Sequence, residues 1–153
     1  MNQVVVLCVD GSDTSIGAAA TGLARLAPAY RTIVATVVDA SDPMLVTGVS
    51  GMAGGAMSPE QVDELNAAHS AHGEAVVQAA LAALDLPDAE TQVLMGEPAT
   101  ELGLFAQEVG ATVLVVGSRG HGALKQAFLG SVSAHLVRNA PCPVLVVRDD
   151  VED

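Results

Sequence analysis

The residues with the clearest chemical potential lie between an apolar run at 113–116 and a Gly-Ser pair at 130–131. The apolar run is followed at once by Gly117, Gly120 and Gly122. Glycines let a backbone approach a phosphate closely, and the free N–H groups and dipole at the start of a helix attract negative charge. The order of strand, glycine-rich loop and helix therefore predicts a nucleotide phosphate site.

Length and composition are those of one domain. The chain has 153 residues, of which 50% are hydrophobic, and a domain of this length buries enough apolar surface to fold without disulfides. No apolar run approaches the roughly 20 residues of a membrane span, and the N-terminus lacks the features of a signal peptide. We therefore expect a single domain over residues 1–153, a cytoplasmic location and no membrane partner.

Net charge and cysteine content limit the kinds of ligand and partner that the sequence predicts. The net charge is −12, from six basic and eighteen acidic residues, and such a chain repels phosphate polymers, so no nucleic-acid partner is expected. A small nucleotide held by backbone amides and a metal ion stays compatible with this charge. Cys8 and Cys142 match no metal-ligand or redox spacing and are expected to be buried free thiols.

Five strand signals alternate with four helix signals along the chain. Apolar runs predict buried strands at residues 4–9, 33–38, 91–95, 113–116 and 144–147. Helical spacing and capping residues predict helices from 13–14 to near 28, and at 58–84, 98–109 and 131–139. This alternation predicts a doubly wound parallel α/β sheet, whose ligands bind at the carboxyl ends of the strands. Residues 41–57, rich in Gly, Ser and Met, are expected to form a mobile surface loop.

These motifs resemble the ATP-binding branch of the universal stress protein family. Gly117-x2-Gly120, nine further residues and Gly130-Ser131 match its G-x2-G-x9-G-[S/T] signature. The likeness also covers the strand ending in Asp10, the segments Val37-Val38-Asp39 and Gly96-Glu97-Pro98, and the closing Pro-Cys-Pro-Val-Leu-Val-Val. It implies a single Rossmann-like sheet of strand order 3-2-1-4-5, bound ATP with Mg²⁺, and homodimers that pair through the C-terminal strand Val144–Val147.

Transferred residue by residue, the resemblance also assigns the base and ribose contacts. The backbone of Val37 would contact adenine, and Cys8 would line the pocket floor beside it. Val116 and Gly117 would pass close to the ribose. Asp10 would face the ribose or assist a nucleotide-bound Mg²⁺, since a carboxylate at a strand end accepts hydroxyl hydrogen bonds and coordinates hard cations.

The phosphate contacts implied by the resemblance follow the glycine signature. Backbone N–H groups of four residues would hold the phosphates, namely Gly120, Gly130, Ser131 and Val132. The Ser131 hydroxyl would add a donor, and the Ser133 hydroxyl an extra contact. Arg119, the only basic side chain among the clustered glycines, could reach the β- or γ-phosphate, because a guanidinium suits bidentate phosphate binding.

Each assignment has a simpler alternative. Gly117 and Gly120 could form a tight turn only, Ser131 and Asp10 could only cap helices, and Arg119 could be solvated. A second pair of residues, His69 and His72, stands one turn apart on the predicted helix 58–84. Their spacing could hold a metal, but no third ligand is evident, and semi-buried helix histidines are the alternative.

Motifs of common enzymes are missing from the sequence. It contains no Gly-x-Ser-x-Gly, no phosphate-binding lysine loop and no zinc-protease pattern. We therefore expect a regulatory protein that binds ATP and responds to stress. Two alternatives stay open: a slow ATPase or an enzyme that phosphorylates itself at Ser131 or Ser133, and a dimeric scaffold that holds no nucleotide.

Overall fold

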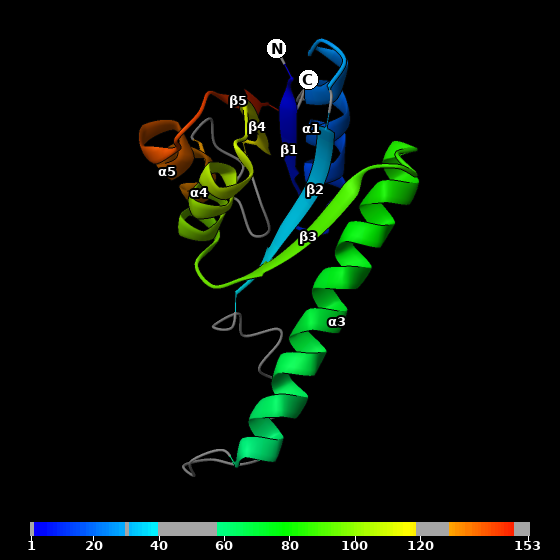
Figure 1. Ribbon diagram of the computed structural model, residues 1–153, viewed down its shortest axis with the longest axis vertical. Coiled ribbons are helices and arrows are strands. Elements are labelled where there is room, and N and C mark those ends of the chain that lie inside the picture. Colours follow the sequence, from blue (N-terminus) through cyan, green and yellow to red (C-terminus); the bar gives the residue numbers. More distant parts are fainter. Residues whose placement is uncertain (1, 30, 40–57, 119–128, 149–153) are drawn as a thin grey trace, which may run out of the picture.

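A five-stranded parallel sheet forms the centre of the protein (Figure 1). The computed structural model describes residues 2–29, 31–39, 58–118 and 129–148. The strands are β1 (Val4–Cys8), β2 (Arg31–Val38), β3 (Glu90–Met95), β4 (Val113–Gly117) and β5 (Val144–Val147). Their order is β3-β2-β1-β4-β5, with every neighbouring pair parallel. The predicted fold class and strand order are thereby confirmed.

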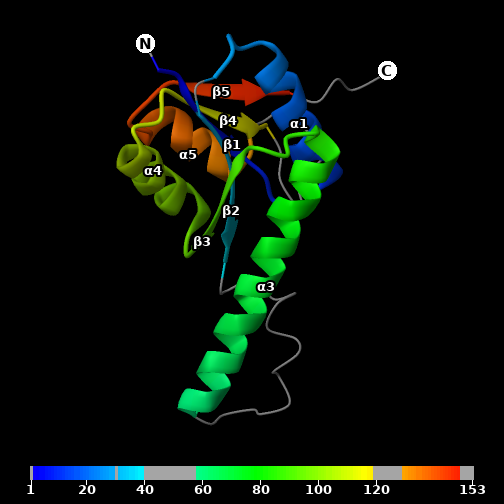
Figure 2. The same cartoon turned by 45° about the vertical axis from the view of Figure 1, so that its right-hand side comes forward.

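Four helices in the described part of the chain enclose this sheet in two layers. They are α1 (Asp13–Ala24), α3 (Pro59–Leu84), α4 (Pro98–Val109) and α5 (Ser131–Asn139). Helices α1 and α3 cover one face, while α4 and α5 cover the other (Figures 1 and 2). Within the described ranges, no helix combines the length and the apolar character that a membrane crossing requires.

Alternation along β1 shows why the strands are continuous apolar runs. Val5 and Leu7 belong to the core cluster under α1 and α3, whereas Val6 and Cys8 belong to the cluster under α4 and α5. Successive side chains point to opposite faces of a sheet, so a strand covered on both sides needs apolar residues at every position. The predicted loop at residues 41–57 lies outside the described residues.

The predicted element boundaries hold to within a few residues, with one larger difference at α1. This helix ends at Ala24, not near Pro28. The N–H groups of Arg25 and Leu26 instead bond the carbonyls three residues back, which tightens the chain into a 3₁₀ turn. The capping box predicted at Ser58 is present, because Gln61 and Ser58 exchange backbone-to-side-chain hydrogen bonds.

Helix α3 is longer than the sheet that it covers. Its N-terminal turns continue past the carboxyl ends of β2 and β3 (Figures 1 and 2). Val62, near the start of this helix, is therefore 41% exposed. Further along, Val77 and Ala80 are completely buried against the sheet. The helix thus has a packed half and a projecting half.

Helix α1 approaches the sheet so closely that one position tolerates no side chain. A Cβ atom on Gly22 would lie 2.3 Å from Cγ1 of Val115, whereas a Cβ on Gly17 would meet nothing within 4 Å. Ala20, on the same helix, is exposed. The position that packs on β4 is Gly22.

This contrast predicts opposite effects for the same substitution in one helix. Gly22→Ala should destabilise the fold by about 1–3 kcal/mol, because overpacking a rigid core forces backbone shifts. Gly17→Ala should stabilise it by up to about 1 kcal/mol, the difference in helix propensity. Urea unfolding of both variants measures the change. Equal effects on the two unfolding free energies would contradict the close approach.

Candidate functional site

The carboxyl ends of β1, β2 and β4 meet at one edge of the sheet. The strand β1 lies between β2 and β4, so the chain leaves β1 toward one side of the sheet and later returns to its other side. Ligands of open α/β sheets bind at this kind of reversal, outside the carboxyl ends of the strands. The segments that follow these strands begin at Val9, Asp39 and Ser118. They form the candidate site.

The loop after β1 is ordered by a hydrogen-bonded network around Asp10. Oδ1 of Asp10 accepts hydrogen bonds from the backbone N–H of Ser12 at 2.9 Å and from the Ser12 hydroxyl. The Ser12 hydroxyl oxygen in turn caps α1 by accepting from the Ser15 N–H at 3.1 Å. The helix cap is therefore Ser12. Asp10, two residues earlier in the chain, holds that cap in place through its hydrogen bonds to Ser12. Gly11 between them has φ +90°, a conformation that favours glycine.

The end of β4 is joined to the start of α5 by backbone hydrogen bonds through Ser118. The Ser118 N–H donates to the Val147 carbonyl at 2.8 Å, and the Ser118 carbonyl accepts from the Gly130 N–H at 2.6 Å. The Gly130 donor, expected to hold phosphate, is thus engaged within the protein. Ser118 was not singled out from the sequence, where only its place after an apolar strand marks it.

Within the described residues, no side chain caps the N-terminus of α5. Gly130 is the N-cap residue, with φ −61° and ψ 162°, and it makes no side-chain hydrogen bond to the helix. Ser131, weighed as a cap, is instead the first residue of the helix and is exposed. First-turn N–H groups have no carbonyl partner within their own helix. The donors of Ser131, Val132 and Ser133 are therefore left without a helical acceptor, which is the arrangement found where helix starts bind anions.

The Ser133 side chain differs from the expectation of an outward contact. It is 1% exposed, and its hydroxyl donates to the Gly130 carbonyl at 3.0 Å. In this arrangement the hydroxyl stabilises the first turn of the helix and does not face the site. The backbone N–H of the same residue belongs to the donor set described above. Burial also separates this hydroxyl from solvent, which does not favour Ser133 as an acceptor for phosphorylation.

The predicted contact between adenine and the backbone of Val37 depends on the direction of the Val37 carbonyl. The Val9 N–H donates to Ala35, and the Gly96 N–H donates to Val38. Carbonyls along a strand alternate between its two neighbours, so the Val37 carbonyl is directed toward β1. That strand ends at Cys8, which leaves this carbonyl beside the loop that carries Asp10.

Cys8 and Val116 lie beneath this edge, and both are 7% exposed. Burial, with a smaller contribution from Cys142, raises the pKa of the Cys8 thiol to about 12. A thiol with a pKa raised in this way stays protonated at neutral pH and is a poor nucleophile. Cys8 can therefore contribute shape and apolar surface to a site. Gly117 at the end of β4 is half-buried.

The remaining predictions concern Arg119, Gly120 and the histidine pair on α3. Arg119 and Gly120 lie outside the described residues. His69 is buried whereas His72 is exposed, so the two imidazoles do not share one environment. No cluster of three or more His, Cys, Asp or Glu side chains suited to a metal ion occurs within residues 2–29, 31–39, 58–118 and 129–148.

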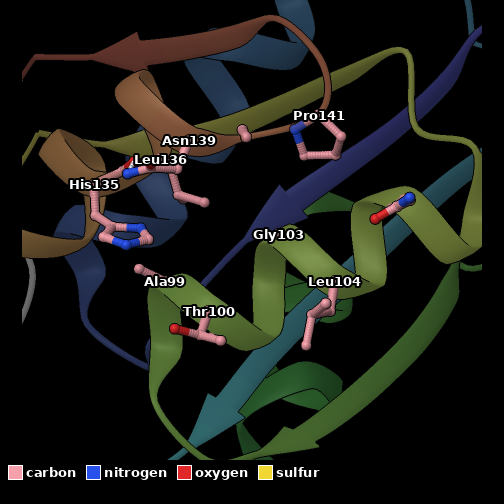
Figure 3. Close-up of a pocket in the computed structure, with 10 residues that line it drawn as sticks. Ala99, Thr100, Gly103, Leu104, His135, Leu136, Asn139 and Pro141 are labelled. Atoms are coloured by element: carbon pink, nitrogen blue, oxygen red, sulfur yellow. Dashed lines mark hydrogen bonds between the residues drawn. The ribbon is translucent and has the colours of Figure 1, made fainter.

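A separate hollow lies between α4 and α5 (Figure 3). Ala99 and Gly103 border it from α4, and His135, Leu136 and Asn139 border it from α5. Its volume of about 220 Å³ is below the roughly 300–1,000 Å³ of ordinary small-molecule sites. The hollow is therefore a weaker nucleotide candidate than the sheet edge.

Comparison with known proteins identifies the family of the chain. A sequence model of the universal stress protein family matches residues 1–148. The universal stress protein YxiE of Bacillus subtilis is 36% identical over 153 residues, which cover 97% of this chain and all of that relative. Both matches extend over almost the entire chain.

Solved structures give the same assignment of the fold. The universal stress protein UspA from Lactobacillus plantarum superposes with a TM-score of 0.71 at 22% identity, over 95% of this chain and 97% of the other. A universal stress protein in complex with cAMP superposes with a TM-score of 0.61 at 29% identity, over 95% of this chain and 96% of the other. From its sequence, fold and relatives, the chain belongs to the universal stress protein family.

Proposed function

We propose that this universal stress protein binds an adenine nucleotide, with ATP as the expected physiological form, at the carboxyl edge of its sheet. The observation that carries the proposal is the start of α5, where no side chain of the described residues caps the helix. Unpaired N–H groups and the helix dipole bind phosphate at such positions. The similar protein solved with cAMP, at 29% identity, supports an adenine nucleotide as the ligand.

The two ends of the ligand would meet different parts of the edge. The N–H groups of Ser131, Val132 and Ser133 would hold the phosphates, while the carbonyl of Val37 would face the base. Asp10 lies after β1, between these two regions, and is the residue expected to meet the ribose or a nucleotide-bound Mg²⁺. Because Oδ1 of Asp10 already accepts from Ser12, this carboxylate is held in place before any ligand arrives.

Titration calorimetry with AMP, ADP and ATP, each with and without Mg²⁺, tests this function. We expect saturable binding and a rise in melting temperature, since a ligand that binds only the folded state stabilises it. No heat and no thermal shift at millimolar nucleotide would overturn the proposal. The chain has no Trp and one Tyr, so adenine that stays bound through purification also shows directly in the ultraviolet spectrum.

A pair of variants at Ser131 separates the backbone donor from the side chain. Ser131→Pro removes the N–H, and it suits the first position of a helix, where this protein already has Pro59 and Pro98. Loss of one charge-assisted hydrogen bond should weaken ATP binding by about 2 kcal/mol, or roughly thirtyfold. Ser131→Ala removes only the hydroxyl and should weaken binding less. Calorimetry that finds equal affinities for Ser131→Pro and the parent would refute the backbone contact.

The dimer is proposed through β5, which is an edge of the described sheet. Leu114 donates to Pro143 and Ser118 donates to Val147, so the alternation of a parallel ladder turns Val146 outward. An outward row of N–H and C=O groups accepts a further strand.

Val146→Pro tests this edge because it removes an outward N–H and leaves the bonds between β4 and β5 in place. We expect the parent to sediment as a dimer and the variant to shift toward monomer with its circular dichroism retained. A monomeric parent, or a folded variant that remains fully dimeric, would refute pairing through this strand.

A further inference from the structure

His69 is a buried polar side chain to which the described part of the chain offers no partner. It is 1% exposed, and neither Nδ1 nor Nε2 forms a hydrogen bond with a described residue. A neutral imidazole offers one donor and one acceptor. Proteins pair nearly all polar atoms that they bury, because an unpaired one loses its water without replacement. The ring therefore has hydrogen-bonding capacity that residues 2–29, 31–39, 58–118 and 129–148 do not use.

The packing of α3 locates this ring at the candidate site. A Cβ on Gly73 would lie 2.9 Å from Val38 at the end of β2, and a Cβ on Gly11 would lie 3.2 Å from Val76. These contacts place this section of α3 beside the carboxyl ends of β1 and β2. His69 precedes Gly73 by about one helical turn on the same face. It therefore lies just beyond the end of β2.

The same packing assigns His69 to one half of the edge. Helix α3 lies over β2 and β3, on the face shared with α1, whereas α5 covers the opposite face. Two strand intervals, roughly 10 Å, also separate β2 from β4, which leads to the phosphate end. His69 is thus near β2, the strand that carries the Val37 carbonyl, and lies away from the helix that would hold phosphate.

We propose that the His69 imidazole hydrogen-bonds the base or ribose of the bound adenine nucleotide and is a specificity-determining contact of the site. The inference rests on the proposed function. The ring is unpaired in the absence of ligand because the ligand supplies its partner. Adenine offers both a donor, its amino group, and ring-nitrogen acceptors, and either complements one nitrogen of a neutral imidazole.

A purely internal role for His69 leads to a different result. If the ring only fills space or holds a trapped water, an apolar residue of similar size changes stability and leaves ligand affinity as it was. If the ring contacts the ligand, the apolar residue lowers affinity while the unliganded fold keeps or gains stability, because an unsatisfied polar group has been removed. Affinity therefore separates the two roles.

The experiment compares His69→Leu with His72→Leu in calorimetric titrations with AMP, which carries the base and ribose. His72 provides the matched control, since it lies on the same helix and is exposed. We expect His69→Leu to bind AMP about three- to tenfold more weakly and His72→Leu to bind like the parent. Equal affinities for the parent and a folded His69→Leu would overturn the proposal.

A second measurement uses the unmodified protein. The chain has four histidines, so ¹⁵N spectra of the labelled rings resolve each imidazole, with the single variants assigning the signals. Added AMP should shift the ring nitrogens of His69 and leave those of His72 in place. A parent that binds AMP without any change at His69 refutes this contact alone. A parent that binds no adenine nucleotide refutes the proposed function as well.

Discussion

The parallel pairing of β1 with β4 is the contact on which the site depends. Val5 lies opposite Val113 and Leu7 opposite Val115, which joins strands that are more than a hundred residues apart in the chain. Because both strands are buried on both faces, shifting them by one residue would turn every side chain to the wrong layer. The register is therefore fixed, and with it the separation between the loop at Asp10 and the segment at Ser118.

Much of the fold follows from local sequence because apolar runs, caps and turn residues agree with one another. Ser58, Pro59 and Gln61 define the start of α3 to the residue. The site is less predictable. Residue type does not reveal that the Gly130 N–H donates to Ser118, since backbone bonds depend on the path of the chain. Nor does it distinguish buried His69 from exposed His72, because the side of α3 that faces the sheet is fixed by distant contacts.

In an acidic protein with a proposed anion site, electrostatic interactions act over two different distances. The net charge of −12 acts at long range, where it slows the approach of a negative ligand and is screened by salt. The donors at the start of α5 act at short range through partial charges on N–H groups, which no titration removes. The proposed site would therefore select a small ligand over a phosphate polymer, because a polymer meets the repulsion along its whole length.

The backbone bonds of Ser118 also have a thermodynamic consequence. They connect Gly130, at the start of α5, to Val147, at the end of the edge strand β5. A ligand at the start of α5 that strengthened these bonds would link its own binding to the order of β5, and linkage between two sites is reciprocal. A ligand that stabilises the start of α5 would then also stabilise the ordered state of β5, by the coupling free energy between the two regions. Any molecule that prefers the ordered edge would raise the affinity for that ligand by the same factor.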